Sequence, residues 1–382
     1  MRQWLPRTCV GLAAAFTLAA CSFGEPPSPE QGEPPQLPTP SPGEHQGDPT
    51  TLIDVMADNL EVPWGLDFLP DGSALVTERD SGRVLQISEE AEPEEIAEIE
   101  VENAGEGGLM GLAVSPDFED DDTIYLYFTS SSDNRVASLD LSEDDPEPEP
   151  IVTDIPSGST HNGGQLAFGP DDYLWASTGD SGVPEFSQEE DNLAGKILRF
   201  DTEGEAADDN PTNDSLVYAL GLRNVQGLAW DSEDELYAVE FGADVADEIN
   251  HIVEGGNYGW PRFEGDANHE NYIDPIVTWD PFEASCSGAT FAEDTLITAC
   301  LRGQRLWTME LSSPGEIDSE PEATIVGEFG RLRSVAVDEE GTLWVTTSNQ
   351  DGRCETNQGC HIDDDDDRVL RFTTTHTAEG RT

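Results

Sequence analysis

Histidine and arginine are scarce in this chain, and the segments that hold them suggest chemistry. His161 lies in the glycine-rich segment Thr160-His161-Asn162-Gly163-Gly164. A histidine can act as a general base near neutral pH, and flanking glycines let a substrate approach its ring closely. Asp180, which follows the next expected strand, could orient the imidazole. The simpler alternatives are a structural hydrogen bond at His161 and a capped turn at Asp180.

Several arginines lie in loops that precede the expected strands. They are Arg223, which is followed by Asn224, and Arg302, Arg331 and Arg333. Guanidinium groups bind carboxylates through paired hydrogen bonds. If these loops converge on one mouth of the molecule, the arginines would bind an anionic ligand with several carboxylates. Local ion pairs with the abundant acidic residues are the alternative for each arginine taken alone.

Two neighbouring segments offer oxygen ligands. Residues 240–250 are rich in acidic side chains, and the glycine-rich motif GGNYGWP follows at residues 255–261. Carboxylates beside flexible backbone carbonyls are the hard oxygen ligands that calcium prefers. These segments therefore indicate a calcium site.

A repeated hairpin must position these residues. Six segments share a small residue, apolar and aromatic or branched residues, an acidic turn and a short strand rich in β-formers; they lie at residues 65–77, 111–127, 165–176, 227–238, 288–298 and 334–345. Recurrence at about 45 to 60 residues is typical of one four-stranded blade per unit. The sequence thus predicts an all-β fold, a six-bladed β-propeller, rather than a β-sandwich. Loops at one end of its central channel would carry the function.

The charge balance excludes one class of partner. The chain has 81 acidic residues against 17 basic ones, a formal net charge of −64. Such a surface repels phosphate, so no nucleic-acid binding is expected. A salt-adapted, solubilising surface is the preferred interpretation. The acidic run 363–367 is expected to be a solvated loop, with calcium binding as the alternative.

The N-terminus has the pattern of an export signal. Arg2 and Arg7 precede an apolar run too short to span a bilayer, and Leu-Ala-Ala-Cys ends it at Cys21. We expect a lipoprotein signal peptide at residues 1–20, a lipid on Cys21 and a Pro/Gly/Glu-rich tether at residues 21–50. The propeller would span residues 51–374, with a disordered tail at 375–382. An ordinary cleaved signal peptide is the alternative to a lipid anchor on the outside of the cell membrane.

Four further cysteines are expected to form disulfides in an oxidising compartment: Cys286, Cys300, Cys354 and Cys360. Pairing Cys286 with Cys300, and Cys354 with Cys360, would close two short loops. The sequence alone leaves three pairings open.

Together these segments resemble the soluble quinoprotein glucose/sorbosone dehydrogenase family, including the bacterial aldose sugar dehydrogenases. The resemblance covers about residues 52–373. It depends on the motifs VPWGL (62–66), GEGGLMG (105–111), HNGG (161–164), LAGKILR (193–199), GLRN (221–224), GGNYGWP (255–261) and RLR (331–333).

The resemblance implies an enzyme with two cofactors, pyrroloquinoline quinone (PQQ) and calcium. It would oxidise the anomeric carbon of aldose sugars to lactones and pass electrons to an external acceptor. His161 matches the general base, Asp180 orients it, and Arg223 acts at the reacting centre. The residues expected to bind PQQ are Glu106, Arg223, Asn224, Arg302, Arg331 and Arg333. Those expected to bind calcium are the carbonyls of Gly242 and Ala243, with Glu248 and the Tyr258 carbonyl at a second calcium.

Two other functions remain open from the sequence. One is a non-catalytic extracellular sugar-binding propeller that has lost turnover. The other is a calcium-dependent lactonase, against which the arginines argue because a neutral lactone does not require them.

Overall fold

The computed structural model describes residues 30–31, 50–89, 91–318, 320–354 and 360–373. The predicted signal peptide, Cys21 and the predicted tail at 375–382 lie outside the described residues. Most of the predicted tether also does. Within it, β1 (Glu30–Gln31) pairs in parallel with β18 (Phe263–Glu264).

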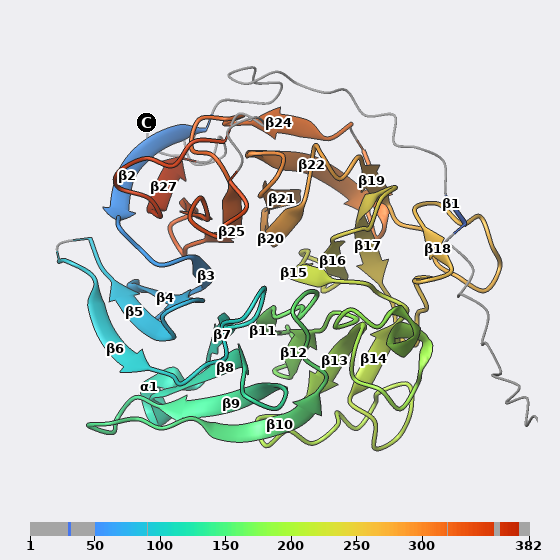
Figure 1. Cartoon of the computed structure of the whole chain (residues 1–382), viewed down its shortest axis with the longest axis horizontal. Helices are drawn as coiled ribbons and strands as arrows, with labels where there is room; N and C mark the ends of the chain where they lie inside the picture. The colour runs from blue at the N-terminus through green and yellow to red at the C-terminus, as the bar shows by residue number, and fades with distance from the viewer. Residues whose placement is uncertain (1–29, 32–49, 90, 319, 355–359, 374–382) are drawn as a thin grey trace, which may run out of the picture.

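The chain forms six antiparallel sheets arranged in a ring, as the repeats predicted (Figure 1). Blade 1 contains β3 (Pro63–Phe68), β4 (Ala74–Glu78), β5 (Arg83–Ile87) and β6 (Glu94–Glu98). Blade 2 contains β7 (Leu109–Val114), β8 (Thr123–Thr129), β9 (Asn134–Asp140) and β10 (Glu149–Ile155). Blade 3 contains β11 (Leu166–Phe168), β12 (Leu174–Ser177), β13 (Lys196–Phe200) and β14 (Val217–Leu220).

The second half of the ring repeats this order. Blade 4 contains β15 (Val225–Trp230), β16 (Leu236–Glu240), β17 (Asp247–Ile252) and β19 (Val277–Trp279). Blade 5 contains β20 (Cys286–Ala292), β21 (Thr295–Cys300), β22 (Arg305–Ser313), β23 (Glu316–Ile317) and β24 (Glu322–Thr324). Blade 6 contains β25 (Leu332–Val337), β26 (Leu343–Thr347), β27 (Val369–Thr373) and β2 (Thr51–Ala57). The helices among the described residues are short: α1 (Phe118–Asp121) and the 3₁₀ turn η1 (Pro184–Gln188).

Each predicted hairpin is the first pair of strands in one blade, and close packing explains its small residue. The first strands of neighbouring blades approach each other around the channel. A side chain at Gly111 would place its Cβ 2.2 Å from the Gly164 carbonyl oxygen. At Gly227 the same distance to the Ser287 carbonyl oxygen is also 2.2 Å. At these two positions only glycine permits so close an approach between neighbouring blades.

The ring is closed by the N-terminal strand. β2 pairs with β27, so that blade 6 combines the beginning and the end of the propeller (Figure 1). Because β2 supplies the outermost strand of that blade, the ring is closed by hydrogen bonds between strands more than 300 residues apart.

The helices found in the described part of the chain are too short to span a lipid bilayer.

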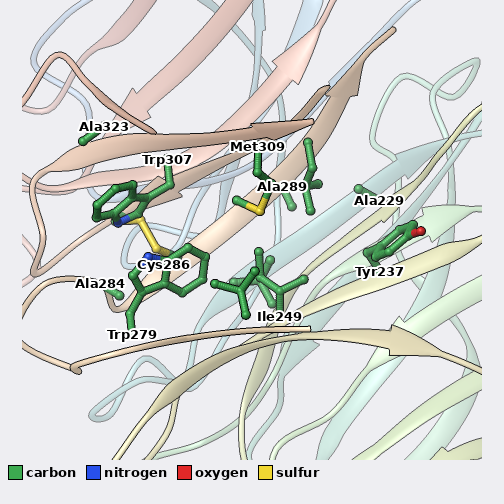
Figure 2. Packing of buried hydrophobic residues seen from close by; sticks show 14 of the residues in the cluster. Ala229, Tyr237, Ile249, Trp279, Ala284, Cys286, Ala289, Trp307, Met309 and Ala323 are labelled. Atoms are coloured by element: carbon green, nitrogen blue, oxygen red, sulfur yellow. A yellow bond between two sulfur atoms is a disulfide. The ribbon is translucent and has the colours of Figure 1, made fainter. Parts of the chain in front are cut away.

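A large apolar cluster fills the space between blades 4 and 5 (Figure 2). Trp279 and Trp307 stack with ring centroids 5.8 Å apart, beside the disulfide between Cys286 and Cys300. The second disulfide joins Cys354 to Cys360. Of the three open pairings, the structure therefore contains the local one.

The acidic run 363–367 corrects one expectation. It was predicted to be a solvated loop, but Asp366 is 2 % exposed and Asp367 is fully buried. The Asp367 carboxylate accepts hydrogen bonds from the backbone N–H of Asn349 at 2.5 Å and Gln350 at 3.2 Å. Burial raises the pKa of Asp367 to about 6. The end of the run is therefore an internal support for the loop after β26.

Candidate functional site

The predicted site residues lie in two kinds of loop that reach the same face of the ring. Strands alternate in direction, so the loops that enter each first strand and those that leave each second strand share one face. His161 and Arg223 precede the first strands β11 and β15, whereas Asp180 follows the second strand β12. Antiparallel pairing therefore brings together residues that are 19 and 62 positions apart.

His161 is held on several sides. Its Nδ1 lies 2.7 Å from Asp180 Oδ1, and the Asp180 side chain is fully buried. Its backbone N–H donates to Glu106 Oε2 at 2.7 Å, and its carbonyl accepts from the Ser181 N–H at 3.0 Å. These contacts stabilise His161 with a backbone φ of +57°, which is unusual for a residue other than glycine.

Arg223 faces the other nitrogen of the ring. Its Nη2 lies 2.9 Å from His161 Nε2, and its Nη1 donates to the Phe241 carbonyl at 3.0 Å. Because a guanidinium can only donate, Nε2 must be the acceptor in this contact. Nδ1 then donates its hydrogen bond to the carboxylate of Asp180. This pairing corresponds to the tautomer with its proton on Nδ1 and its lone pair at Nε2. That is the form required of a general base.

Asn224 contributes a donor without a partner. Its Oδ1 accepts the Gly163 N–H at 3.0 Å, which fixes the amide orientation. Its Nδ2 is buried and has no hydrogen-bond partner among the described residues, and the same is true of Arg223 Nε. Buried donors normally have partners, so two orphaned ones beside the predicted base fit an acceptor-rich ligand.

Glu106 links opposite sides of the mouth. One carboxylate oxygen accepts the His161 backbone N–H, and the other pairs with Arg353 from the loop after β26. Arg353 is half exposed, with 55 % of its side chain accessible. The sequence did not indicate Arg353.

Arg331 and Arg333 are buried together near a carboxylate that sequence reasoning missed. Arg331 Nη2 lies 2.7 Å from Asp351 Oδ2, and Arg333 Nη2 lies 3.9 Å from the same atom. Burial, and then the charge of Arg79, lower the pKa of Arg333 to about 9. The two guanidinium charges lower the pKa of Asp351 against the opposing effect of burial. A single carboxylate thus faces two buried cations, which leaves net positive charge.

Arg302 lies apart from this network. Its guanidinium carbon is 3.4 Å from the centre of the Phe282 ring, and Phe282 is 66 % exposed. Both residues flank strands of blade 5 on the site face, next to the Cys286–Cys300 disulfide. The structure therefore brings Arg302 to the same face, where it stacks on Phe282 rather than joining the hydrogen bonds of His161 described above.

The loop that carries Gly242 and Ala243 wraps around one buried carboxylate. Glu264 Oε1 accepts four consecutive backbone N–H groups, those of residues 243–246, at 2.6 to 3.1 Å. The Gly242 N–H donates to Asp247 Oδ1 at 2.7 Å. Glu264 was not predicted, because its contacts with this loop come from a strand 18 to 21 residues further along.

Several carboxylates are buried beneath this loop. Burial, and then the charge of Glu248, raise the pKa of Glu240 well above its usual value. Burial raises the pKa of Glu248 to about 7 and that of Asp247 to about 7. Glu248 accepts the Gly265 N–H at 2.5 Å, and nearby Asn250 Oδ1 is buried without a partner among the described residues. So much buried acid fits a cation, since positive charge would restore the ionised forms.

Among the described residues, those predicted to bind calcium are not gathered into a side-chain cage. Among the described residues no group of three or more His, Cys, Asp or Glu side chains is arranged to hold a metal ion. The hydroxyl of Tyr258 donates to the His251 carbonyl at 2.7 Å, and its backbone N–H donates to the Leu220 carbonyl at 3.0 Å. Ligation would therefore depend on backbone carbonyls, as the sequence predicted for Gly242, Ala243 and Tyr258.

Comparisons with known proteins identify the family of the chain. Residues 60–356 match the family model described as Glucose / Sorbosone dehydrogenase. The PQQ-bound aldose sugar dehydrogenase of Streptomyces coelicolor superposes with a TM-score of 0.81 at 42 % identity, over 85 % of this chain and 97 % of that one. Aldose sugar dehydrogenase YliI of Escherichia coli is 27 % identical over 79 % of this chain and 91 % of its own.

A third relative matches only in part. Quinoprotein glucose dehydrogenase B of Acinetobacter calcoaceticus is 32 % identical over 57 % of this chain, and the match spans 54 % of the relative's length.

Fold and site thus define a six-bladed propeller with a buried, arginine-rich mouth built around a histidine–carboxylate pair. The chain belongs to the glucose/sorbosone dehydrogenase family. The predicted fold and the predicted family of dehydrogenase enzymes are confirmed.

Proposed function

We propose that this protein oxidises the anomeric carbon of aldose sugars to lactones, with PQQ and calcium as cofactors and an external electron acceptor. The observation that carries the proposal is the pair of contacts made by the His161 ring, 2.7 Å from Nδ1 to Asp180 and 2.9 Å from Nε2 to Arg223. Similarity to the PQQ-bound Streptomyces coelicolor enzyme at 42 % identity supports the choice of cofactor.

His161 would take the proton of the sugar's anomeric hydroxyl on Nε2. The substrate hydroxyl would replace Arg223 as the partner of that nitrogen, and Arg223 would then bind the oxygen on which negative charge develops. Asp180 would stabilise the imidazolium that results and keep the ring oriented. The geometry supports the roles of Asp180 and Arg223, which lie 2.7 Å from Nδ1 and 2.9 Å from Nε2 of the His161 ring.

The buried donors would hold the quinone. Asn224 Nδ2 and Arg223 would bind its oxygens, and Arg331 and Arg333 would bind its carboxylates, with Glu106 at the edge of the site. Bound there, PQQ supplies a two-electron acceptor for the hydride that leaves the anomeric carbon. Arg302 would reach a carboxylate only by leaving the Phe282 ring.

Calcium would be held by the carbonyls of Gly242 and Ala243, and a second ion by Glu248 with the Tyr258 carbonyl. The raised pKa values of Asp247 and Glu248 support a cation nearby, since burial alone leaves their charge unbalanced. A lipid on Cys21 would anchor the enzyme outside the cell membrane. The two disulfides fit an oxidising compartment.

The first experiment is dye-coupled oxidation of an aldose panel by the purified protein, with and without added PQQ and calcium. The proposal requires oxidation that appears only when both are present, with a lactone as product. Lactone hydrolysis without PQQ would replace the proposal with a lactonase. Sugar binding without turnover would replace it with a binding protein.

A further inference from the structure

The GGNYGWP motif supplies a contact to the histidine–carboxylate pair through Trp260. The Trp260 indole Nε1 donates to Asp180 Oδ2 at 2.9 Å. The other carboxylate oxygen of Asp180 accepts from His161 Nδ1 at 2.7 Å and from the Gly182 N–H at 2.8 Å. Asp180 is fully buried and Trp260 is 7 % exposed, so water cannot readily replace the indole as a donor.

Trp260 is itself fixed at both backbone groups. Its N–H donates to the Gly221 carbonyl at 2.9 Å, and its carbonyl accepts from Gln188 Nε2 at 2.7 Å. Gln188 also exchanges hydrogen bonds with the Asn257 side chain, at 3.0 and 2.9 Å. The indole is therefore attached to the segment that leads into Arg223 and to η1.

The ring also lies beside the other partner of the base. The guanidinium carbon of Arg223 is 5.5 Å from the centre of the Trp260 ring, within the range of a cation–π contact. One side chain thus contacts both groups that face His161, Asp180 on one side of the imidazole and Arg223 on the other.

We propose that Trp260 is a positioning residue for the base, acting through Asp180. Two donors on Oδ1 and one on Oδ2 fix the rotation of the carboxylate about its Cβ–Cγ bond. Without the indole N–H, Oδ2 would be a buried acceptor with no partner, and the carboxylate would turn or draw in water. His161 would then lose its fixed direction toward the substrate. This inference depends on the proposed function for its kinetic consequence, but not for its structural one.

The test uses Trp260→Phe, which removes the N–H and keeps an aromatic ring. Trp279→Phe is the matched control, because Trp279 is 1 % exposed and its Nε1 has no hydrogen-bond partner among the described residues. Both variants lose the same buried volume, but only one loses a hydrogen bond to Asp180. We expect kcat to fall about 10- to 150-fold in Trp260→Phe, as for loss of one buried hydrogen bond to a charged group, with KM changed less than twofold. Trp279→Phe should keep the wild-type kcat.

A second measurement needs neither cofactor nor substrate. In ¹⁵N-histidine-labelled protein, the His161 Nδ1–H should give a far-downfield proton signal, identified by its loss in His161→Asn. Trp260→Phe should broaden or shift that signal, and Trp279→Phe should leave it in place. If Trp260→Phe does not fold, Gln188→Met, which removes the anchor of the Trp260 carbonyl, should move the signal in the same direction.

The outcomes separate the two proposals. An unchanged signal in Trp260→Phe, or a fall in kcat no larger than in Trp279→Phe, would overturn the role of Trp260. Wild-type protein that oxidises no aldose with PQQ and calcium would overturn the proposed function instead, while a shifted signal would still support the positioning contact.

Discussion

A second histidine, His251, also pairs with a carboxylate, and comparing it with His161 shows which contacts distinguish the predicted base. The ring of His251 lies 2.7 Å from Glu235 and the His251 side chain is 19 % exposed, the same distance and exposure as for His161 and its partner Asp180. The partners differ, because the side chain of Glu235 is 38 % exposed and that of Asp180 is fully buried. However, His251 uses Nε2 for its carboxylate and lies beside Tyr237, with ring centroids 5.3 Å apart. Of these two histidines, His161 is the one whose second ring nitrogen faces a guanidinium group.

Replacement of these two histidines gives a matched pair of variants. We expect His161→Asn to lower kcat by about 10²- to 10⁴-fold, the usual contribution of a general base, without preventing PQQ binding. His251→Asn should keep kcat within twofold. Steady-state kinetics and absorbance titration with PQQ measure the two effects. Equal losses in both variants would mean that His161 contributes structure rather than proton transfer.

A variant of Asn224 tests whether its buried, unpartnered Nδ2 binds the cofactor. Asn224→Asp keeps the oxygen that accepts the Gly163 N–H and replaces the unpartnered Nδ2 with a second acceptor. An acceptor that faces quinone oxygens repels them, so the affinity for PQQ should fall about 10- to 100-fold. Fluorescence titration of the protein with PQQ measures the affinity. A variant that binds PQQ as tightly as the wild type would remove Asn224 from the cofactor site.

At this scale the sequence predicted the residues with distinctive chemistry and missed the common ones. His161 and Arg223 stood out because histidine and arginine are scarce and lie in glycine-rich loops, and Asp180 stood out because it follows the strand after His161. Asp351 and Glu264 also make several contacts at the candidate site, but no sequence feature distinguishes them from the other acidic residues, of which the chain has 81 in total. Their importance comes from contacts made across loops, which no local pattern records.

At the scale of elements, the only lysine of the sequence, Lys196, joins β13 to η1 through hydrogen bonds. Lys196 is fully buried at the start of β13, and its Nζ donates to the carbonyls of Phe186 at 2.8 Å, Ser187 at 3.1 Å and Ala194 at 2.7 Å. Three acceptors match the three donors of an ammonium group. The lysine therefore secures η1, the turn that carries the anchor of Trp260.

Lys196→Met should reveal this buried charge through the pH dependence of stability. Burial lowers the pKa of Lys196 to about 7, against the opposing charge of Glu189. In the unfolded chain lysine titrates near 10.4, so between pH 7 and 9 the unfolded state binds more protons. The free energy of unfolding should therefore rise with pH in the wild type, by at most about 1.4 kcal/mol per pH unit from this group.

Denaturant titration at pH 7, 8 and 9 gives the comparison. The rise should be smaller in Lys196→Met, because methionine fills similar space and does not titrate. Parallel pH dependences in the two proteins would contradict a buried titrating lysine. The difference between the proteins is the relevant quantity, since buried carboxylates titrate in both.

The elements themselves were predictable in part. Every first hairpin of a blade was visible because close packing around the channel demands small residues, and the turns demand acidic or glycine residues. The outer strands have no such constraint and vary in length, from the two residues of β23 to the nine of β22. The pairing of β2 with β27 was not visible, because β2 carries no copy of the repeat.

At the scale of the whole molecule, charge opposes compactness. With a formal net charge of −64, the folded chain repels itself over its whole surface, although its buried ion pairs, such as Arg331 with Asp351, are shielded from solvent. Raising the salt concentration from 0.1 to 1 M shortens the screening length from about 10 to about 3 Å. Surface repulsion should weaken, while the buried pairs should change little.

We therefore expect Tm to rise by several degrees between 0.1 and 1 M KCl, with most of the gain at the lower concentrations, where screening changes fastest. Thermal melts followed by circular dichroism measure it. Tetramethylammonium chloride should give a similar rise, because a bulky cation screens charge but does not enter a specific potassium site. A rise limited to KCl would indicate specific ion binding, and a flat or falling Tm would mean that the acidic surface is neutral in its effect on stability.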